Sequence, residues 1–246
     1  MTQLVALDSQ THRDLRVATW PAAEARVDVV SVVPREFPRL LAHYPIFFAR
    51  TPATGRFEPA VLLGFQPGEN LFLTERQWDV EYVPLQMQRQ PFSLMERRAV
   101  QPGGQPGLDV ALDLSNPRVQ RQEGERLYLD DGKPSQMLQT IASILRALIE
   151  GSQEAYAFTG KLAELGLIEP VRIDVKFVDE SEKRIEGVYW IAAAALKALP
   201  AAQLAELRDL GYLEWLYFQM ASLSHMSGLV ARKNRVLSGL GAKPAS

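Results

Sequence analysis

The sequence changes character near Gly132, and this change limits the folds open to the chain. Before it, short runs rich in β-branched and aromatic residues are separated by Pro- and Gly-rich turns, a pattern typical of strands. After it, apolar residues recur at the spacing of amphipathic helices. Strands and helices that are segregated along a chain favour a packed α+β fold over alternating βαβ units. We therefore predict an α+β fold with a β-rich N-terminal half and a mainly helical C-terminal half that contains one inserted β-hairpin.

The N-terminal half is predicted to consist of short strands with two brief helices between them. Strands are expected over residues 26–33, 46–50, 60–65, 71–74, 92–98 and 110–114. Residues 60–65 and 71–74 flank a Pro-Gly turn and are expected to pair as a hairpin. The brief helices are expected over 36–44 and 83–90.

The C-terminal half is predicted to open with a helix that Ser135 caps. This helix is expected to reach Gly166, either unbroken or divided at Gly151. The inserted hairpin is expected to pair 171–178 with 184–191. The remaining helices are expected over 192–199, 202–209 and 211–235.

Chain length leaves two domain organisations open. The chain has 246 residues, and domains commonly have about 100–200. One domain over residues 1–246 is the more economical prediction, and an internal boundary near 125–135 is the alternative.

Composition excludes several classes of site. The chain has no cysteine, which excludes disulfides, thiolate nucleophiles, iron–sulfur clusters and cysteine-ligated zinc. A formal net charge of −2 does not indicate a nucleic-acid partner, because such proteins usually carry a basic excess. The sequence also lacks a secretory signal and any apolar stretch long enough to span a membrane. We expect a cytoplasmic protein with no nucleic-acid partner and no membrane span.

A weak metal motif lies near the N-terminus. His12-Arg13-Asp14 matches the His-x-Asp part of an iron site built from two histidines and one carboxylate. His225 or His43 would then be the third ligand, and the metal would activate oxygen or a cosubstrate. Otherwise His12 and Asp14 are surface residues near a chain end. No metal or cofactor is predicted, and iron is kept as the alternative.

A cluster of aromatic and charged residues is the candidate binding site. Trp78, Asp79, Tyr82, Arg89 and Phe92 lie within a short span. Exposed aromatic rings beside arginine are typical of binding surfaces. The same residues are also compatible with core packing around an irregular segment.

The last predicted helix carries an apolar stripe at helical spacing. Its members are Leu213, Leu216, Tyr217, Met220, Leu223, Met226, Leu229 and Val230. Such a stripe suits a core helix or the seam of a homodimer through residues 211–235.

Several short segments support a family resemblance through their order and spacing. They are 12–17, Val33-Pro34 with Glu36-Phe37, 43–48, Leu63-Gly64 with 68–72, Trp78-Asp79 with 82–84, Arg89 with Pro91-Phe92, 124–127 with Asp131-Gly132 and Pro134, 187–189 with Leu196 and 199–200, and Leu213, Tyr217 and Ser222-Leu223. Over nearly the whole chain they resemble the SapC-like family of bacterial proteins.

The resemblance implies a genomic setting and no catalytic residues. Members of the family are associated with surface-layer loci. They often lie near genes for halogenase-like, cupin or JmjC-like proteins and TonB-dependent receptors. An unrelated peptide-transporter permease shares the name, but it is a membrane protein.

Three functions follow as hypotheses. The first is an accessory protein that binds a protein or peptide partner made or modified by neighbouring enzymes. The alternatives are a metal-dependent, iron-oxygenase-like enzyme that modifies peptides or amino acids, and a structural homodimer.

Overall fold

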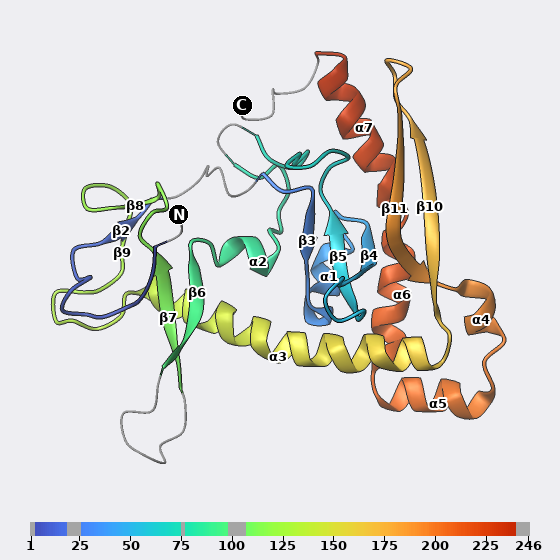
Figure 1. The fold of residues 1–246 in the computed structure, drawn as a ribbon, viewed down its shortest axis with the longest axis horizontal. Coiled ribbons are helices and arrows are strands. Elements are labelled where there is room, and N and C mark those ends of the chain that lie inside the picture. Colours follow the sequence, from blue (N-terminus) through green and yellow to red (C-terminus); the bar gives the residue numbers. More distant parts are fainter. Residues whose placement is uncertain (1–2, 19–25, 75–76, 98–106, 240–246) are drawn as a thin grey trace. The chain divides into compact units, whose positions relative to one another are not determined.

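The computed structural model describes residues 3–18, 26–74, 77–97 and 107–239 (Figure 1). Strands are concentrated in the first half of the chain and helices in the second, which confirms the predicted α+β fold. The chain divides into two compact units, each built from two stretches of sequence. Unit 1 comprises Met1–Glu24 and Leu85–Ile149, and unit 2 comprises Ala25–Pro84 and Glu150–Ser246. That the whole chain acts as one domain stays a prediction.

Unit 1 contains two small antiparallel sheets and helical segments. In spatial order the first sheet consists of β1 (Leu4–Ala6), β7 (Gly107–Asp113) and β6 (Phe92–Arg97), and the second of β8 (Val119–Gln120), β2 (Arg16–Val17) and β9 (Glu125–Arg126). The helical segments are α2 (Leu85–Gln88) and the first part of α3 (Gln136–Glu164). Ser135 accepts the Leu138 N–H at 3.2 Å, so the predicted cap is confirmed. The core of this unit includes Leu15, Phe92, Leu112, Leu127, Leu138 and Leu145.

Unit 2 is built on a five-stranded antiparallel sheet. Its spatial order is β10 (Ile168–Lys176), β11 (Glu182–Ile191), β4 (Ile46–Arg50), β5 (Phe57–Leu62) and β3 (Val29–Ser31). Ile46, Phe47 and Phe48 of β4 are all buried. Because successive side chains of a strand point to opposite faces, both faces of β4 are covered.

The helices of unit 2 pack around one phenylalanine. They are the 3₁₀ turn Pro34–Glu36, α1 (Phe37–Leu40), the second part of α3, α4 (Ala193–Lys197), α5 (Ala201–Asp209), α6 (Tyr212–Ser222) and α7 (His225–Leu237). Phe158 of α3 is fully buried. Its ring centroid lies 6.4 Å from that of Phe37, 6.2 Å from Phe48 and 5.4 Å from Trp215. These contacts join α1, α3, α6 and the sheet in one core.

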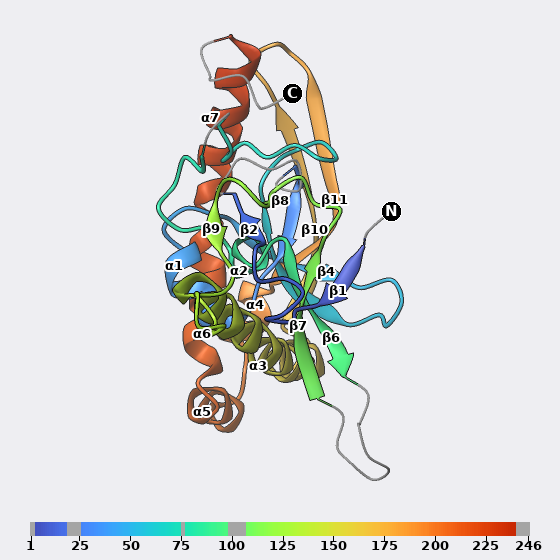
Figure 2. The same cartoon turned by 90° about the vertical axis from the view of Figure 1, so that its left-hand side faces the viewer.

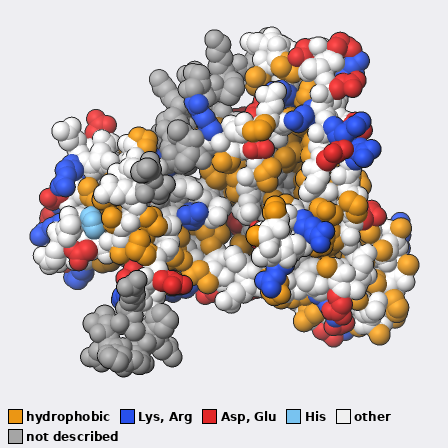
Figure 3. Space-filling view, viewed as in Figure 1, with side chains coloured by type: hydrophobic (Ala, Val, Ile, Leu, Met, Phe, Trp, Pro, Cys, Tyr) orange, Lys and Arg blue, Asp and Glu red, His pale blue; other side chains and the backbone are white. Residues whose placement is uncertain are grey.

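The β10–β11 hairpin was predicted. α7 lies beside the end of the hairpin that contains its turn (Figures 1 and 2). The Val178 N–H donates to Asn234 Oδ1 of α7 at 3.0 Å. Charged side chains of both signs lie over the hairpin (Figure 3), among them the exposed pair Arg184–Asp174 at 2.6 Å. Exposed pairs of this kind add little stability, so the contacts with α7 matter more for the position of the hairpin.

The predicted pairing of 60–65 with 71–74 is wrong. β5 pairs with β3 and β4 instead, and residues 71–74 form no strand. The reason is that β3 and β4 occupy the two edges of β5. A tight loop follows β5 and is closed where the Leu71 N–H donates to the Leu63 carbonyl at 2.8 Å. Gly64 makes this loop possible, since a Cβ there would lie 2.1 Å from the Glu69 carbonyl oxygen.

The single helix predicted over 211–235 is also wrong, because α6 ends at Ser222 and α7 begins at His225. At the junction, Leu223 and Ser224 donate their N–H groups to carbonyls three residues earlier. Ser224 Oγ also donates to the Ala221 carbonyl at 2.9 Å. Serine competes with the helix by bonding its own backbone, which favours the break.

A glycine inside α3 gives the first testable prediction. A Cβ at Gly151 would lie 2.6–2.9 Å from three side-chain atoms of Val33, whereas Gly160 of the same helix has open space there. We expect Gly151→Ala to destabilise unit 2 by about 1–3 kcal/mol through overpacking, and Gly160→Ala to stabilise it by up to about 1 kcal/mol through helix propensity. Urea unfolding measures both changes. Adding Val33→Ala should recover part of the loss, and equal effects of the two glycine variants would contradict the close packing.

Candidate functional site

The five residues of the predicted binding cluster are divided between the two units. Trp78, Asp79 and Tyr82 belong to unit 2, and Arg89 and Phe92 belong to unit 1. Trp78 and Phe92 are buried, Tyr82 and Arg89 are partly buried, and Asp79 is exposed. Their joint role in binding stays a prediction.

In unit 1, Arg89 and Phe92 are part of one turn after α2. Arg89 donates from Nη1 to the Phe92 carbonyl at 2.6 Å and from Nε to Gln86 Oε1 at 2.7 Å. Burial lowers the pKa of the Arg89 guanidinium from its ordinary value. Both hydrogen bonds tie the side chain to its own turn.

In unit 2, Tyr82 fastens one end of the irregular stretch whose described residues are 70–74 and 77–82, which we call segment 70–82. Its hydroxyl donates to Glu36 Oε1 at 2.9 Å, and Glu36 Oε2 accepts the Val33 N–H at 3.0 Å. Burial raises the pKa of Tyr82, and the Glu36 carboxylate raises it further. The Tyr44 hydroxyl donates to the Tyr82 carbonyl at 2.6 Å. The segment therefore ends on a buried polar network next to α1.

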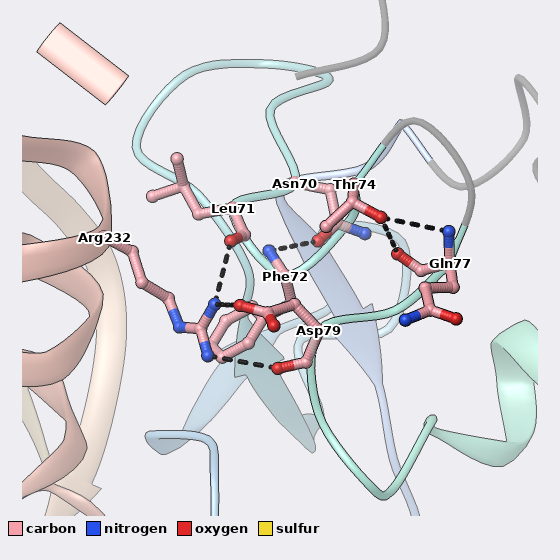
Figure 4. Close-up of polar contacts among 7 residues, drawn as sticks. All are labelled: Asn70, Leu71, Phe72, Thr74, Gln77, Asp79 and Arg232. Carbon is pink, nitrogen blue, oxygen red and sulfur yellow. Dashed lines mark hydrogen bonds and ion pairs between the residues drawn. The ribbon is translucent and has the colours of Figure 1, made fainter. Parts of the chain in front are cut away.

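The middle of the segment is shaped by local hydrogen bonds. Asn70 Oδ1 accepts the Phe72 N–H at 3.0 Å, and Thr74 Oγ1 accepts the Gln77 N–H at 3.1 Å (Figure 4). Trp78 packs inside the segment, and within the described residues its buried Nε1 has no hydrogen-bond partner. These contacts leave the Asp79 side chain at the surface.

Arg232 of α7 holds the same segment from the other side (Figure 4). Its Nη1 donates to Asp79 Oδ2 at 2.7 Å and to the Leu71 carbonyl at 3.4 Å, and its Nη2 donates to the Asp79 carbonyl at 3.4 Å. The guanidinium carbon lies 4.6 Å from the centre of the Phe72 ring, within the range of a cation–π contact. One side chain therefore fixes two points of the segment, Leu71 and Asp79, to α7.

The next residue of α7 makes a buried ion pair. Lys233 Nζ lies 2.5 Å from Glu69 Oε1, and the side chains are 8% and 12% exposed. Glu69 Oε2 also accepts the Phe65 N–H at 2.8 Å. Two successive cations of α7 thus bind both ends of the chain stretch between Glu69 and Asp79.

A hollow of about 240 Å³ lies beside these ion pairs, and we call it the α7 pocket. Its polar lining includes His43, His225, Arg232 and Arg235, and its apolar lining includes Phe72 and Leu229. His225 Nε2 lies 2.6 Å from the Leu41 carbonyl. Since a carbonyl only accepts, Nε2 carries a hydrogen, and within the described residues Nδ1 makes no hydrogen bond.

The other two polar groups of the pocket are less constrained. Within the described residues, His43 makes no side-chain hydrogen bond and Arg235 makes no ion pair, and Arg235 is exposed. The pocket therefore presents one guanidinium that is paired with Asp79, one that is unpaired, and two imidazoles.

A protein-family model described as SapC matches residues 7–229. The chain belongs to the SapC family. A search of the curated proteins and a search of the solved structures found no match. In the part of the SapC chain that the structure describes, no helix is long and apolar enough to cross a membrane.

The histidines of the iron hypothesis are divided between the units of this SapC chain. His12 and Asp14 belong to unit 1, whereas His43 and His225 belong to unit 2. His12 Nδ1 accepts the Asp8 N–H at 3.0 Å. Among the residues described, no three His, Cys, Asp or Glu side chains are grouped so that they could hold a metal ion. Neither unit by itself therefore assembles the proposed ligand set.

Sequence reasoning missed Phe72, Arg232 and Arg235 as site residues of the SapC chain. A signal for the arginines was present, because positions 225, 229, 232 and 235 are three or four apart and share one face of a helix. Leu229 also belongs to the apolar stripe along 211–235, and this stripe predicted a core helix or a dimer seam instead of a polar site.

Proposed function

We propose that this SapC-family chain is a cytoplasmic accessory protein that binds a protein or peptide partner. The contact surface proposed for it consists of α7, residues 41–44 and segment 70–82, with the α7 pocket at its centre. The observation that carries the proposal is a hollow beside two ion pairs in which, among the described residues, the side chains of His43 and Arg235 are unpaired.

The way the surface is held supports a binding role. The ion pairs Arg232–Asp79 and Lys233–Glu69 fix segment 70–82 to α7, and Tyr82 fixes it to Glu36. Groups that are already held in place lose little conformational entropy when a partner binds, which favours affinity.

The size of the pocket favours a partner polypeptide over a cofactor. Small-molecule and cofactor sites usually occupy about 300–1,000 Å³, and the α7 pocket occupies about 240 Å³. A hollow of this size suits one residue of a larger partner, with the surrounding surface providing the rest of the contact.

Site-specific photo-crosslinking tests the proposal. Ala231 is exposed and lines the pocket, and Ala202 is equally exposed on α5, outside the pocket. A photoreactive amino acid at each position, in the organism that encodes the chain, should give one defined covalent partner from 231 and none from 202. Products of neighbouring genes are the first candidates. The purified partner should then bind the purified chain.

Three results would count against the proposal. They are equal crosslinking from both positions, a crosslink only between two copies of the chain, and a crosslinked protein that fails to bind when both are purified. The second result would favour the homodimer hypothesis.

A further inference from the structure

We propose that the α7 pocket binds the C-terminal residue of the partner polypeptide, with its carboxylate on the arginines and its apolar side chain on Phe72 and Leu229. This inference rests on the proposed function and deepens it, because it names the chemical group that the pocket recognises.

The charge of the pocket calls for an anion. Arg232 and Arg235 are permanently charged, and Asp79 is the carboxylate that contacts Arg232. Glu69 is already paired with Lys233, so it does not neutralise the pocket. Among the described residues the Arg235 guanidinium has no partner, and its planar fork matches a carboxylate in two parallel hydrogen bonds.

Arg232 is placed to hold such a group without leaving its present partners. It uses Nη1 for Asp79 Oδ2 and the Leu71 carbonyl, and Nη2 for the Asp79 carbonyl. A guanidinium has five N–H donors in all, so within the described part of the chain Nε and the second hydrogen of Nη2 have no acceptor. The bond to Asp79 also fixes the orientation of the guanidinium plane.

His43 adds a donor on the wall formed by the turn after α1 and the start of α7. His43 has both ring nitrogens free of hydrogen bonds within the described residues. His225 is oriented by its Nε2–H bond to the Leu41 carbonyl. A neutral His43 ring offers one N–H to a carboxylate oxygen.

The apolar lining explains why the ligand is a chain end. A terminal residue carries its carboxylate and its side chain on the same Cα, so both fit within one residue-sized hollow. Phe72 and Leu229 would cover an apolar side chain of this residue while the arginines bind the carboxylate. An internal Asp or Glu carries its carboxylate at the end of its own side chain, so it has no separate apolar side chain on the same Cα to place on Phe72 and Leu229.

The chain offers a direct readout, because it has three histidines. The probe is the acetylated pentapeptide Gly-Ser-Gly-Ser-Leu with a free C-terminus, titrated into the full chain at constant pH. NMR signals of the ring Cε1–H groups are assigned by single His→Gln variants. We expect saturable shifts for His43 and His225 and none for His12, with a Kd of about 1 mM or below, as a single-residue contact allows.

Matched probes and variants separate the carboxylate from other causes. The same peptide with a C-terminal amide should bind at least about tenfold more weakly, since a charge-assisted pair is lost. An amidated peptide with an internal Glu should bind as weakly, since its carboxylate does not share a Cα with an apolar side chain for Phe72 and Leu229. Arg235→Ala should weaken the free-acid peptide by a similar factor. Arg208→Ala, an exposed arginine of α5, should leave it unchanged.

Equal binding of the acid and amide peptides would overturn the inference, as would shifts of all three histidines or no shift in the millimolar range.

Failure of this inference is distinct from failure of the proposed function. If position 231 crosslinks a partner that still binds after its C-terminus is extended by Gly-Ser, the carboxylate inference is wrong and the accessory role stands. If position 231 crosslinks nothing, the proposed function is wrong whatever the peptides do.

Discussion

The Lys233→Met variant is expected to lose about 3–5 kcal/mol of unfolding free energy, because it leaves a buried carboxylate without its counter-charge. Lys233 and Glu69 are almost completely buried, and their charged atoms are 2.5 Å apart. The Phe65 N–H also holds Glu69, so its carboxylate cannot turn to solvent without a further loss. The pair links α7 to the segment that forms the pocket, and the loss should therefore affect the whole of unit 2.

Urea unfolding followed by tryptophan fluorescence measures this loss, because Trp78, Trp190 and Trp215 all belong to unit 2. The matched control is Lys176→Met, which removes an exposed ion pair with Glu180 and should cost less than about 1 kcal/mol. Adding Glu69→Gln to Lys233→Met should recover most of the loss, since an amide oxygen still accepts the Phe65 N–H. Equal losses for the two lysine variants would contradict the buried pair.

The second large effect is expected for Gln219→Leu. Gln219 is fully buried on α6, where its Nε2 donates to the Ile46 carbonyl at 2.9 Å and its Oε1 accepts the Ile191 N–H at 3.2 Å. Leucine fills the space but offers no hydrogen bond, so one group on β4 and one on β11 lose their partners. Each buried group left unpaired costs about 1–3 kcal/mol, which gives a loss of about 2–5 kcal/mol for the variant.

The same unfolding measurement tests the Gln219 bridge. Gln153→Leu, on the exposed face of α3, makes the same chemical change and should alter stability by about 0.5 kcal/mol or less. A Gln219→Leu protein as stable as the Gln153→Leu protein would show that α6 is not held to the sheet through these bonds.

The fold could be predicted where its elements are long and periodic. The long helix α3 and the hairpin β10–β11 were predicted in nearly correct positions, because their apolar spacing extends over many residues. The two-residue strands β2, β8 and β9 are too short to show any period. The pairing of β5 was predicted wrongly because the Pro-Gly turn after it suggested a hairpin with residues 71–74. In the sheet, β5 pairs with β3 and β4 instead.

The site could be predicted only in part. Asp79 was named from the sequence, but its partner Arg232 lies 153 positions away, and no local pattern connects them. The break between α6 and α7 also could not be read from the apolar stripe, which continues through it. Ser222, the last residue of α6, accepts the Ile46 N–H with its Oγ at 2.9 Å, and this contact exists only in the folded sheet.

Hydrogen–deuterium exchange of the purified chain, alone and saturated with the partner crosslinked from position 231, tests the binding surface most directly. We predict slower exchange in residues 41–44, in segment 70–82 and in α7, with α5 and the β6–β7 sheet unchanged. Protection confined to other segments, or no protection when the partner is bound, would contradict the account.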